Sequence, residues 1–293
     1  MTLKESFNRL RKNTFPPSIN DMEWRFNELN ARIQAVQRFV DSRIIQKECE
    51  QETQRLIREL FRLITPMQAQ GVKKIRVGSA HDGGYVQLDD LEHVSLALSF
   101  GICDDDNWDM AMAARGIKVW QYDHTINHAP SSHPLLVFHK KMVSSESSSD
   151  AITLSELVVA HEETETPNIF LKIDIEGDEW KVFDATPESH LNRIAQIVCE
   201  FHNLSQLSES GFYNIAFRVF EKLSRSFAVT HVHANNCAPV VNLSNVIIPD
   251  VIELSFANRK RYSFCESAEI FPTELDAPCD KDNADIFLGK FMF

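Results

Sequence analysis

Short apolar runs alternate with helical segments between residues 95 and 262, and this alternation restricts the fold more than any other feature of the sequence. The runs that predict strands are 95–101, 118–123, 135–142, 168–176, 195–203, 227–235 and 251–262. Helices are expected near 108–115, 152–161 and 213–226. Apolar strands separated by helices indicate a parallel sheet covered on both faces. We therefore expect an α/β fold with a doubly wound, Rossmann-like sheet.

Residues 1–70 follow a different pattern, which predicts an N-terminal helical arm in front of a main domain at 71–293. No glycine or proline occurs from Asp21 to Thr65. Apolar residues recur there at the spacing of one helix stripe, namely at Leu29, Ile33, Val36, Val40 and Ile44, and then at Leu56, Leu60 and Leu63. Two interpretations stay open. The arm either packs on its own domain or pairs with a second subunit in a homo-oligomer.

The composition excludes several classes of protein. The formal net charge is -12 and the pI is near 5.4. A general nucleic-acid binder carries a basic face, so no nucleic-acid partner is expected. No apolar run reaches the roughly 18 residues of a membrane span, the N-terminus MTLKESFNRLRKN is polar, and the six cysteines are scattered without a CxxC pair. These features predict a cytoplasmic protein without a membrane partner.

The ends of the first two expected strands carry residues suited to a ligand that contains ribose. The first strand ends at Gly101, where the missing side chain lets a ligand approach the backbone, and aspartates follow at 104–106. The second ends at Asp123, an acid placed to accept hydrogen bonds from ribose hydroxyls. The carboxylates would repel a pyrophosphate, and the G-x-G-x-x-G pattern is missing, so NAD is not expected. S-adenosylmethionine fits better, because it has a ribose, no phosphate and a cationic sulfonium.

Three segments together resemble FkbM-type methyltransferases, namely Arg76-x-Gly78-x5-Gly84-Tyr85-Val86, SFGICDDDNWDMAMAARGIKVWQYDHT at 99–125, and KIDIEG at 172–177. The similarity extends to methyltransferase-like proteins with a DGGYV element and covers about residues 75–255. It implies a class I methyltransferase fold, in which the last strand of a seven-stranded sheet is antiparallel. The chain departs from ordinary methyltransferases at the glycine-rich loop, of which only Gly101 remains.

The resemblance also implies a function and a cofactor. Many members of the family resemble S-adenosylmethionine-dependent O-methyltransferases, so we expect methylation of a hydroxyl on a sugar or nucleotide-linked sugar, in polysaccharide or glycan biosynthesis. The residues expected at the cofactor are Asp82, Gly83, Gly84, Tyr85, Gly101, Asp106, Asp123 and Val143. Of these, Asp123 would hold the ribose. Simpler roles stay open, since an acid at 104–106 can cap the next helix and Asp82–Gly84 can form a plain hairpin turn.

Acids and histidines gather at the ends of the later strands. Asp174 ends one strand, and Glu200 and His202 end the next, two apart and therefore on the same face. We expect these three side chains to converge, with His233 as a further metal ligand. Mixed carboxylate and imidazole ligands suit Mn²⁺, Fe²⁺ or Zn²⁺, whereas carboxylates with waters suit Mg²⁺. The alternative is that the histidines are hydrogen-bonded groups of the core or of a substrate site.

Two functional hypotheses follow from these residues. In the first, Asp174 and His202 are catalytic and activate the acceptor hydroxyl, either alone or with a divalent metal. In the second, the chain is a non-catalytic or metal-hydrolase domain that keeps the sheet and the acid–histidine cluster without using the cofactor. Binding of S-adenosylmethionine distinguishes the two.

Overall fold

The computed structural model describes Phe26, Leu29 and residues 43–161 and 166–293. The chain divides into two compact units, Met1–Ile45 and Gln46–Phe293. Most of the first expected helix stripe, including Ile33, Val36 and Val40, therefore lies outside the described residues. Ile44, at the end of that stripe, lies in a strand, β1 (Ile44–Lys47). Two adjacent β-branched residues favour this extended conformation.

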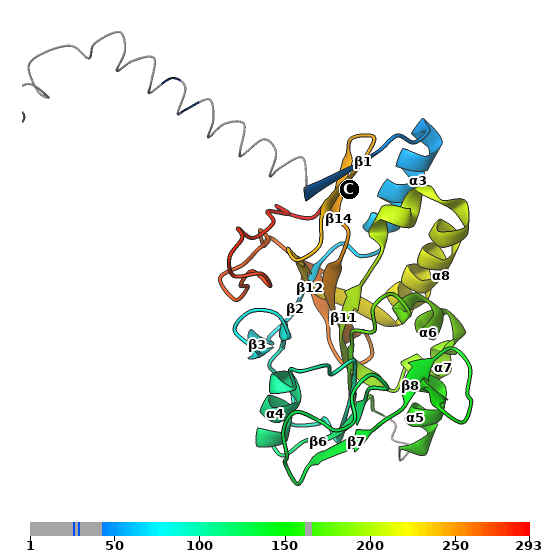
Figure 1. Ribbon diagram of the computed structural model, residues 1–293, viewed down its shortest axis with the longest axis vertical. Coiled ribbons are helices and arrows are strands. Elements are labelled where there is room, and N and C mark those ends of the chain that lie inside the picture. The colour runs from blue at the N-terminus through cyan, green and yellow to red at the C-terminus, as the bar shows by residue number, and fades with distance from the viewer. Residues whose placement is uncertain (1–25, 27–28, 30–42, 162–165) are drawn as a thin grey trace, which may run out of the picture. The chain divides into compact units, whose positions relative to one another are not determined.

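A seven-stranded sheet forms the centre of the unit Gln46–Phe293 (Figure 1). Its strands in chain order are β5 (Leu96–Phe100), β6 (Lys118–Tyr122), β7 (Leu136–His139), β10 (Ile169–Ile173), β11 (Ile194–Phe201), β12 (Phe227–Ala234) and β15 (Ile252–Asn258). In space the order is β12-β15-β11-β10-β5-β6-β7. The last strand, β15, is antiparallel to β11 and β12, whereas the pairs from β11 to β7 are parallel. The expected α/β fold with a seven-stranded, mostly parallel sheet is confirmed.

Later strands of the chain are added on both sides of the first strand of the central sheet, β5. From β5 the chain goes to β6 and β7 on one side, and later to β10 and β11 on the other. The strand order therefore reverses between β5 and β10. In open α/β sheets, the crevice at the carboxyl ends of the strands at such a point is where ligands bind. Gly101 and Asp174 follow directly on these two strands.

Helices cover both faces of the sheet. The helix α4 (Asn107–Ala114) contacts β3 and β6. The helices α6 (Glu179–Ala185) and α7 (Glu188–Leu191) each contact α8 (Ser210–Ser226), α6 contacts β11 and α8 contacts β12. Figure 1 shows α4 on the opposite side of the sheet from α6 and α8. Two further helical elements belong to this part of the chain, α5 (Leu154–Ala160) and the 3-10 helix η1 (Leu204–Ser208). Both layers of helix are expected for a parallel sheet, because its two faces are apolar.

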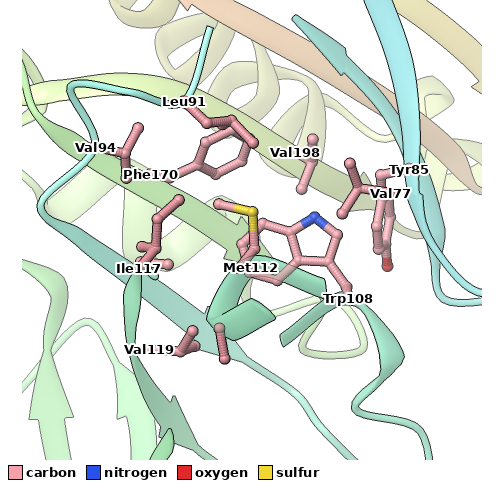
Figure 2. Packing of buried hydrophobic residues seen from close by; sticks show 12 residues of the cluster. Val77, Tyr85, Leu91, Val94, Trp108, Met112, Ile117, Val119, Phe170 and Val198 are labelled. Atoms are coloured by element: carbon pink, nitrogen blue, oxygen red, sulfur yellow. The ribbon is translucent and has the colours of Figure 1, made fainter. Parts of the chain in front are cut away.

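The core on the α4 side is built around Trp108 (Figure 2). The Trp108 ring lies 5.3 Å from that of Phe170 on β10, and its indole N–H donates to Gln87 Oε1 at 2.9 Å. Met112 and Tyr85 belong to the same buried cluster. This cluster fastens α4 and the hairpin of Tyr85 to the sheet, and so positions the loops that follow β5.

The helix α3 (Gln51–Arg62) belongs to the compact unit Gln46–Phe293. Its residues Ile57, Leu60 and Phe61 are completely buried, and the helix contacts α8. The Phe61 ring lies 4.8 Å from that of Phe293. Of the predicted stripe Leu56, Leu60 and Leu63, Leu60 is therefore buried within its own unit, beside Ile57 and Phe61.

Smaller strands surround the central sheet. They pair as β3 (Lys74–Gly78) with β4 (Gly84–Leu88), β2 (Met67–Ala69) with β16 (Phe264–Glu266), β8 (Met142–Ser144) with β9 (Ala151–Thr153), and β13 (Val240–Leu243) with β14 (Val246–Pro249). Lys47, the last residue of β1, accepts a backbone hydrogen bond from Ser244 at 3.0 Å. Within the described residues, no helix is long and apolar enough to cross a membrane.

Candidate functional site

A cavity of about 740 Å³ opens at the carboxyl ends of β5, β6 and β10, where the strand order reverses. Six of the residues predicted to contact the cofactor line it: Asp82, Gly83, Tyr85, Gly101, Asp123 and Val143. Gly84 and Asp106 are not among its lining residues. The volume is in the usual range for a small-molecule site, which is about 300–1,000 Å³.

Gly101 is the point at which the cavity floor meets the sheet. Its φ of +75° is unfavourable for any residue with a side chain. A Cβ at this position would stand 1.6 Å from the backbone oxygen of Asp174, so no larger residue fits without moving β10. The Gly101 N–H donates to the Tyr122 carbonyl at 3.1 Å. The loop after β5 therefore lies directly on the end of the neighbouring strand, and its backbone faces the cavity.

Asp123 lines the cavity, and its carboxylate is already bonded to the protein. Its Oδ2 accepts the backbone N–H groups of Ile102 and Cys103, both at 2.9 Å. Its Oδ1 accepts the Thr125 N–H at 2.7 Å and the Thr125 hydroxyl at 2.6 Å. Burial opposes ionisation, but these hydrogen bonds prevail and lower the pKa of Asp123 to about 2. Asp123 is thus a fixed anion that ties the loop after β5 to β6.

Gly84 and Asp106 have local structural roles. A Cβ on Gly84 would stand 2.0 Å from the Ser79 carbonyl oxygen, because the β3–β4 hairpin closes tightly there. Asp106 occupies the N-cap position of α4, and its Oδ2 accepts the N–H of Ser131 at 2.9 Å. Asp105 accepts the N–H of Asn107 at the start of the same helix, at 2.7 Å. The expected cap thus comes from Asp105, and Asp106 fastens the loop after β6.

The charge of the cavity wall is mainly negative. The acids that line it are Asp82, Asp104, Asp105, Asp123, Asp174, Glu176 and Asp178, against the bases Lys141, Lys172 and His124. Lys172 is only 5% exposed, and its Nζ donates to the Gly101 carbonyl at 2.6 Å. Such a wall disfavours a phosphate group inside the cavity and suits a cationic or neutral group there.

Asp174, Glu200 and His202 converge at the edge of this cavity, as the sequence predicts. Nε2 of His202 lies 3.8 Å from Asp174 Oδ1 and 3.5 Å from Glu200 Oε2. One ligand atom from each of the three lies within 4.8 Å of the others, a spacing that can hold a metal ion. Oδ1 of Asp174 is buried and has no hydrogen-bond partner among the described residues.

Glu179 is a member of this cluster that we did not predict. Its carboxylate is completely buried, and Oε1 accepts the Ile175 N–H at 2.8 Å and lies 3.2 Å from His202 Nδ1. It therefore orients the imidazole from the side opposite Asp174. The sequence signal was an acid in the first turn of the helix after KIDIEG, and such acids are common enough at helix starts to be passed over.

The environment shifts the pKa values of these groups. Burial raises the pKa of Asp174 to about 6, although Lys172 and His202 oppose the shift. Burial also raises the pKa of Glu200 well above its ordinary value, and the nearby Asp174 raises it further. Burial by itself would lower the pKa of His202, but the hydrogen bond and charge of Glu179 raise it instead. The cluster therefore places a carboxylate and an imidazole side by side, and the pKa of each is raised above its ordinary value.

His233 lies with a different set of partners. Its Nδ1 is 2.9 Å from Glu253 Oε2 and its Nε2 is 3.1 Å from both oxygens of Asp285. These two carboxylates outweigh the effect of burial and raise the pKa of His233 to about 10. The structure groups His233 with Glu253 and Cys279, and not with Asp174, Glu200 and His202. The reason is that β15 lies between β11 and β12, so Glu253 stands where we expected His233 to meet Glu200.

The cavity also contains a buried hydroxyl without a partner. Tyr85 is 2% exposed, and its hydroxyl has no hydrogen bond among the described residues. Burial raises the pKa of Tyr85 well above its ordinary value, and the charges of Asp174, Glu200 and Glu253 add to the shift. The hydroxyl is therefore neutral, faces several carboxylates, and has an unused donor.

Neither a scan against protein-family models nor a search of the curated proteins finds a match to this chain. The resemblance to FkbM-type methyltransferases stays a prediction.

Proposed function

We propose that the protein is an S-adenosylmethionine-dependent O-methyltransferase that acts on a hydroxyl of a sugar or nucleotide-linked sugar. The observation that carries the proposal is the cavity at the point of strand reversal, with Gly101, Asp123 and Asp174 at the ends of three neighbouring strands. The antiparallel last strand, β15, agrees with the class I methyltransferase sheet that the resemblance implies.

The residues of the cavity fit this cofactor. Gly101 lines the cavity and has no side chain to cover its backbone, so a ligand can approach that backbone closely. The acidic wall suits a cationic sulfonium. When bound, S-adenosylmethionine supplies an electrophilic methyl group to the acceptor oxygen. All four acceptor positions of the Asp123 carboxylate are taken, so a ribose hydroxyl would have to replace the Thr125 hydroxyl there.

Asp174 is the residue placed to receive the proton of the acceptor. A sugar hydroxyl is a poor nucleophile at neutral pH and reacts faster when a base takes its proton as the oxygen attacks. Asp174 lines the cavity and its side chain is 27% exposed, so an acceptor in the cavity can reach its carboxylate. His202, held by Glu179 on its far side, stabilises the carboxylate before the transfer. A divalent ion held by Asp174, Glu200 and His202 would lower the pKa of the hydroxyl instead.

Calorimetry tests the proposal. Titration of S-adenosylmethionine into the full chain should show binding at one site, and release of S-adenosylhomocysteine should increase with added hexoses or nucleotide-linked sugars. The matched control is S-adenosylhomocysteine, which shares the adenosine but lacks the cation. An absence of binding by both molecules would favour the alternative, a domain that keeps the fold without using the cofactor.

A further inference from the structure

Glu200 and Glu253 stand opposite each other in the antiparallel pair β11–β15. Both residues are buried, with exposures of 3% and 7%. One carboxylate oxygen from each lies within 4.8 Å of an oxygen of Asp82, which belongs to the loop between β3 and β4. Like charges directly opposite each other destabilise a sheet, and buried carboxylates need a compensating positive charge or a proton.

The protein compensates these three carboxylates unequally. Both carboxylate oxygens of Glu253 have a hydrogen-bond partner, because His233 bonds Oε2 at 2.9 Å and the Cys279 thiol donates to Oε1 at 3.1 Å. Among the described residues, the Glu200 carboxylate accepts only the Asn235 amide, at 3.3 Å from each of its oxygens, beside the His202 ring. A positive charge between Glu200 and the loop would therefore relieve most of the repulsion.

The Tyr85 hydroxyl is a second, independent sign of a ligand at this place. It is almost completely buried, has no hydrogen-bond partner among the described residues, and lines the cavity together with Asp82. Buried hydroxyls are nearly always hydrogen-bonded. A water on a bound ion would accept from this hydroxyl or donate to it, and would satisfy it.

We propose that Asp82, Glu200 and Glu253 form a second divalent-cation site, which shares Glu200 with the group of Asp174 and His202. The two groups have Glu200 in common, so its carboxylate would bridge the two ions. Paired catalytic metals stand about 3.5–4 Å apart in such bridged sites. Since every ligand of the second site is an oxygen, its ion is a hard cation such as Mg²⁺ or Mn²⁺.

The neighbouring group of His233, Glu253 and Cys279 is not proposed as a third site. Both nitrogens of His233 are already bonded to carboxylates. The existence of the second site does not depend on methyl transfer, because neither cofactor nor acceptor contributes a ligand to it.

Mn²⁺ binding to the full chain, without cofactor, tests the site. Electron paramagnetic resonance counts the bound ions and detects their magnetic coupling. Wild type should bind two coupled Mn²⁺ ions, and Asp82→Asn and Asp174→Asn should each bind one uncoupled ion. Asp104→Asn is the matched control, since Asp104 is an acid of the same cavity wall outside both groups, and it should keep two.

Three outcomes would overturn the second site: fewer than two ions in the wild type, two ions without coupling, or an unchanged count in Asp82→Asn. The wild-type count needs no variant and is decisive even if a substitution impairs folding. Melting curves of the variants show that each remains folded during the measurement.

Discussion

The backbone carbonyl of Asp174 lies against Gly101, so close that a Cβ on residue 101 would stand 1.6 Å from the Asp174 oxygen. This contact joins the ends of β5 and β10, the two strands between which the strand order reverses. It leaves the Asp174 side chain facing the cavity beside the Gly101 loop. One contact therefore fixes both the Gly101 loop, which lines the cavity, and Asp174, the proposed base.

Gly101→Ala should disrupt this contact. The positive φ and the clash with a backbone atom should together cost roughly 2–5 kcal/mol of unfolding free energy. Gly116→Ala is a matched control, because Gly116 has a φ of +82° and open space around its Cβ position. It should cost only about 1–2 kcal/mol. Urea unfolding measures both, and equal losses would show that the clash is relieved at no cost.

Asp174→Asn should abolish methyl transfer and leave S-adenosylmethionine affinity within a few-fold of the wild type. The amide keeps the shape of the side chain but cannot take the proton of the acceptor. Asp178→Asn is the control, because Asp178 also lines the cavity but pairs with Lys181 at 2.8 Å. Calorimetry and turnover are measured in parallel. A fully active Asp174→Asn protein would contradict the proposed role.

Stability should also depend on pH through Asp174. Its pKa is raised to about 6 in the folded protein, so the folded state holds this proton more tightly than the unfolded chain does. The contribution of Asp174 to the free energy of unfolding is most favourable at about pH 4 and below. It falls by up to roughly 3 kcal/mol as the pH rises to about 6. Asp174→Asn should therefore be stabilised relative to the wild type at pH 7 but not at pH 4. Urea unfolding at both values of pH checks this, and a difference that does not change with pH would exclude the shift.

His233→Gln should destabilise the protein by about 3–5 kcal/mol at pH 7, because it leaves Glu253 and Asp285 without their shared cation. The pKa of His233 is raised to about 10, so its contribution is complete below about pH 6.5 and is lost as the pH rises through 10. Wild type and variant should therefore approach each other in stability near pH 10. His128→Gln, at an exposed histidine, is the control and should have almost no effect at either pH.

The oligomer prediction needs a cut that preserves α3. Residues Ile57, Leu60 and Phe61 are buried within the unit Gln46–Phe293, so a chain that begins near Val72 would lose part of its core. A chain that begins at Gln46 keeps them. If the preceding residues pair subunits, light scattering should show a dimer or larger for the full chain and a monomer for the shortened one. The same number of chains per particle for both proteins would rule the pairing out.

The sequence by itself determined the fold class, because burial on both faces of a parallel sheet leaves a local pattern. Each of the seven expected runs overlaps a strand of the central sheet, and the helices expected near 108–115 and 213–226 are α4 and α8. The convergence of Asp174, Glu200 and His202 was expected on the assumption that β10 and β11 are neighbours, since neighbouring parallel strands end at the same edge.

Only the tertiary structure decided which strands are neighbours. Hydrogen bonding between distant segments sets the strand order, and no local period records it. The insertion of β15 between β11 and β12 places Glu253 opposite Glu200 and moves His233 to Asp285. The role of Tyr85 depends in the same way on the packing of the β3–β4 hairpin against the sheet, which brings a buried hydroxyl to acids more than 80 residues away in the chain.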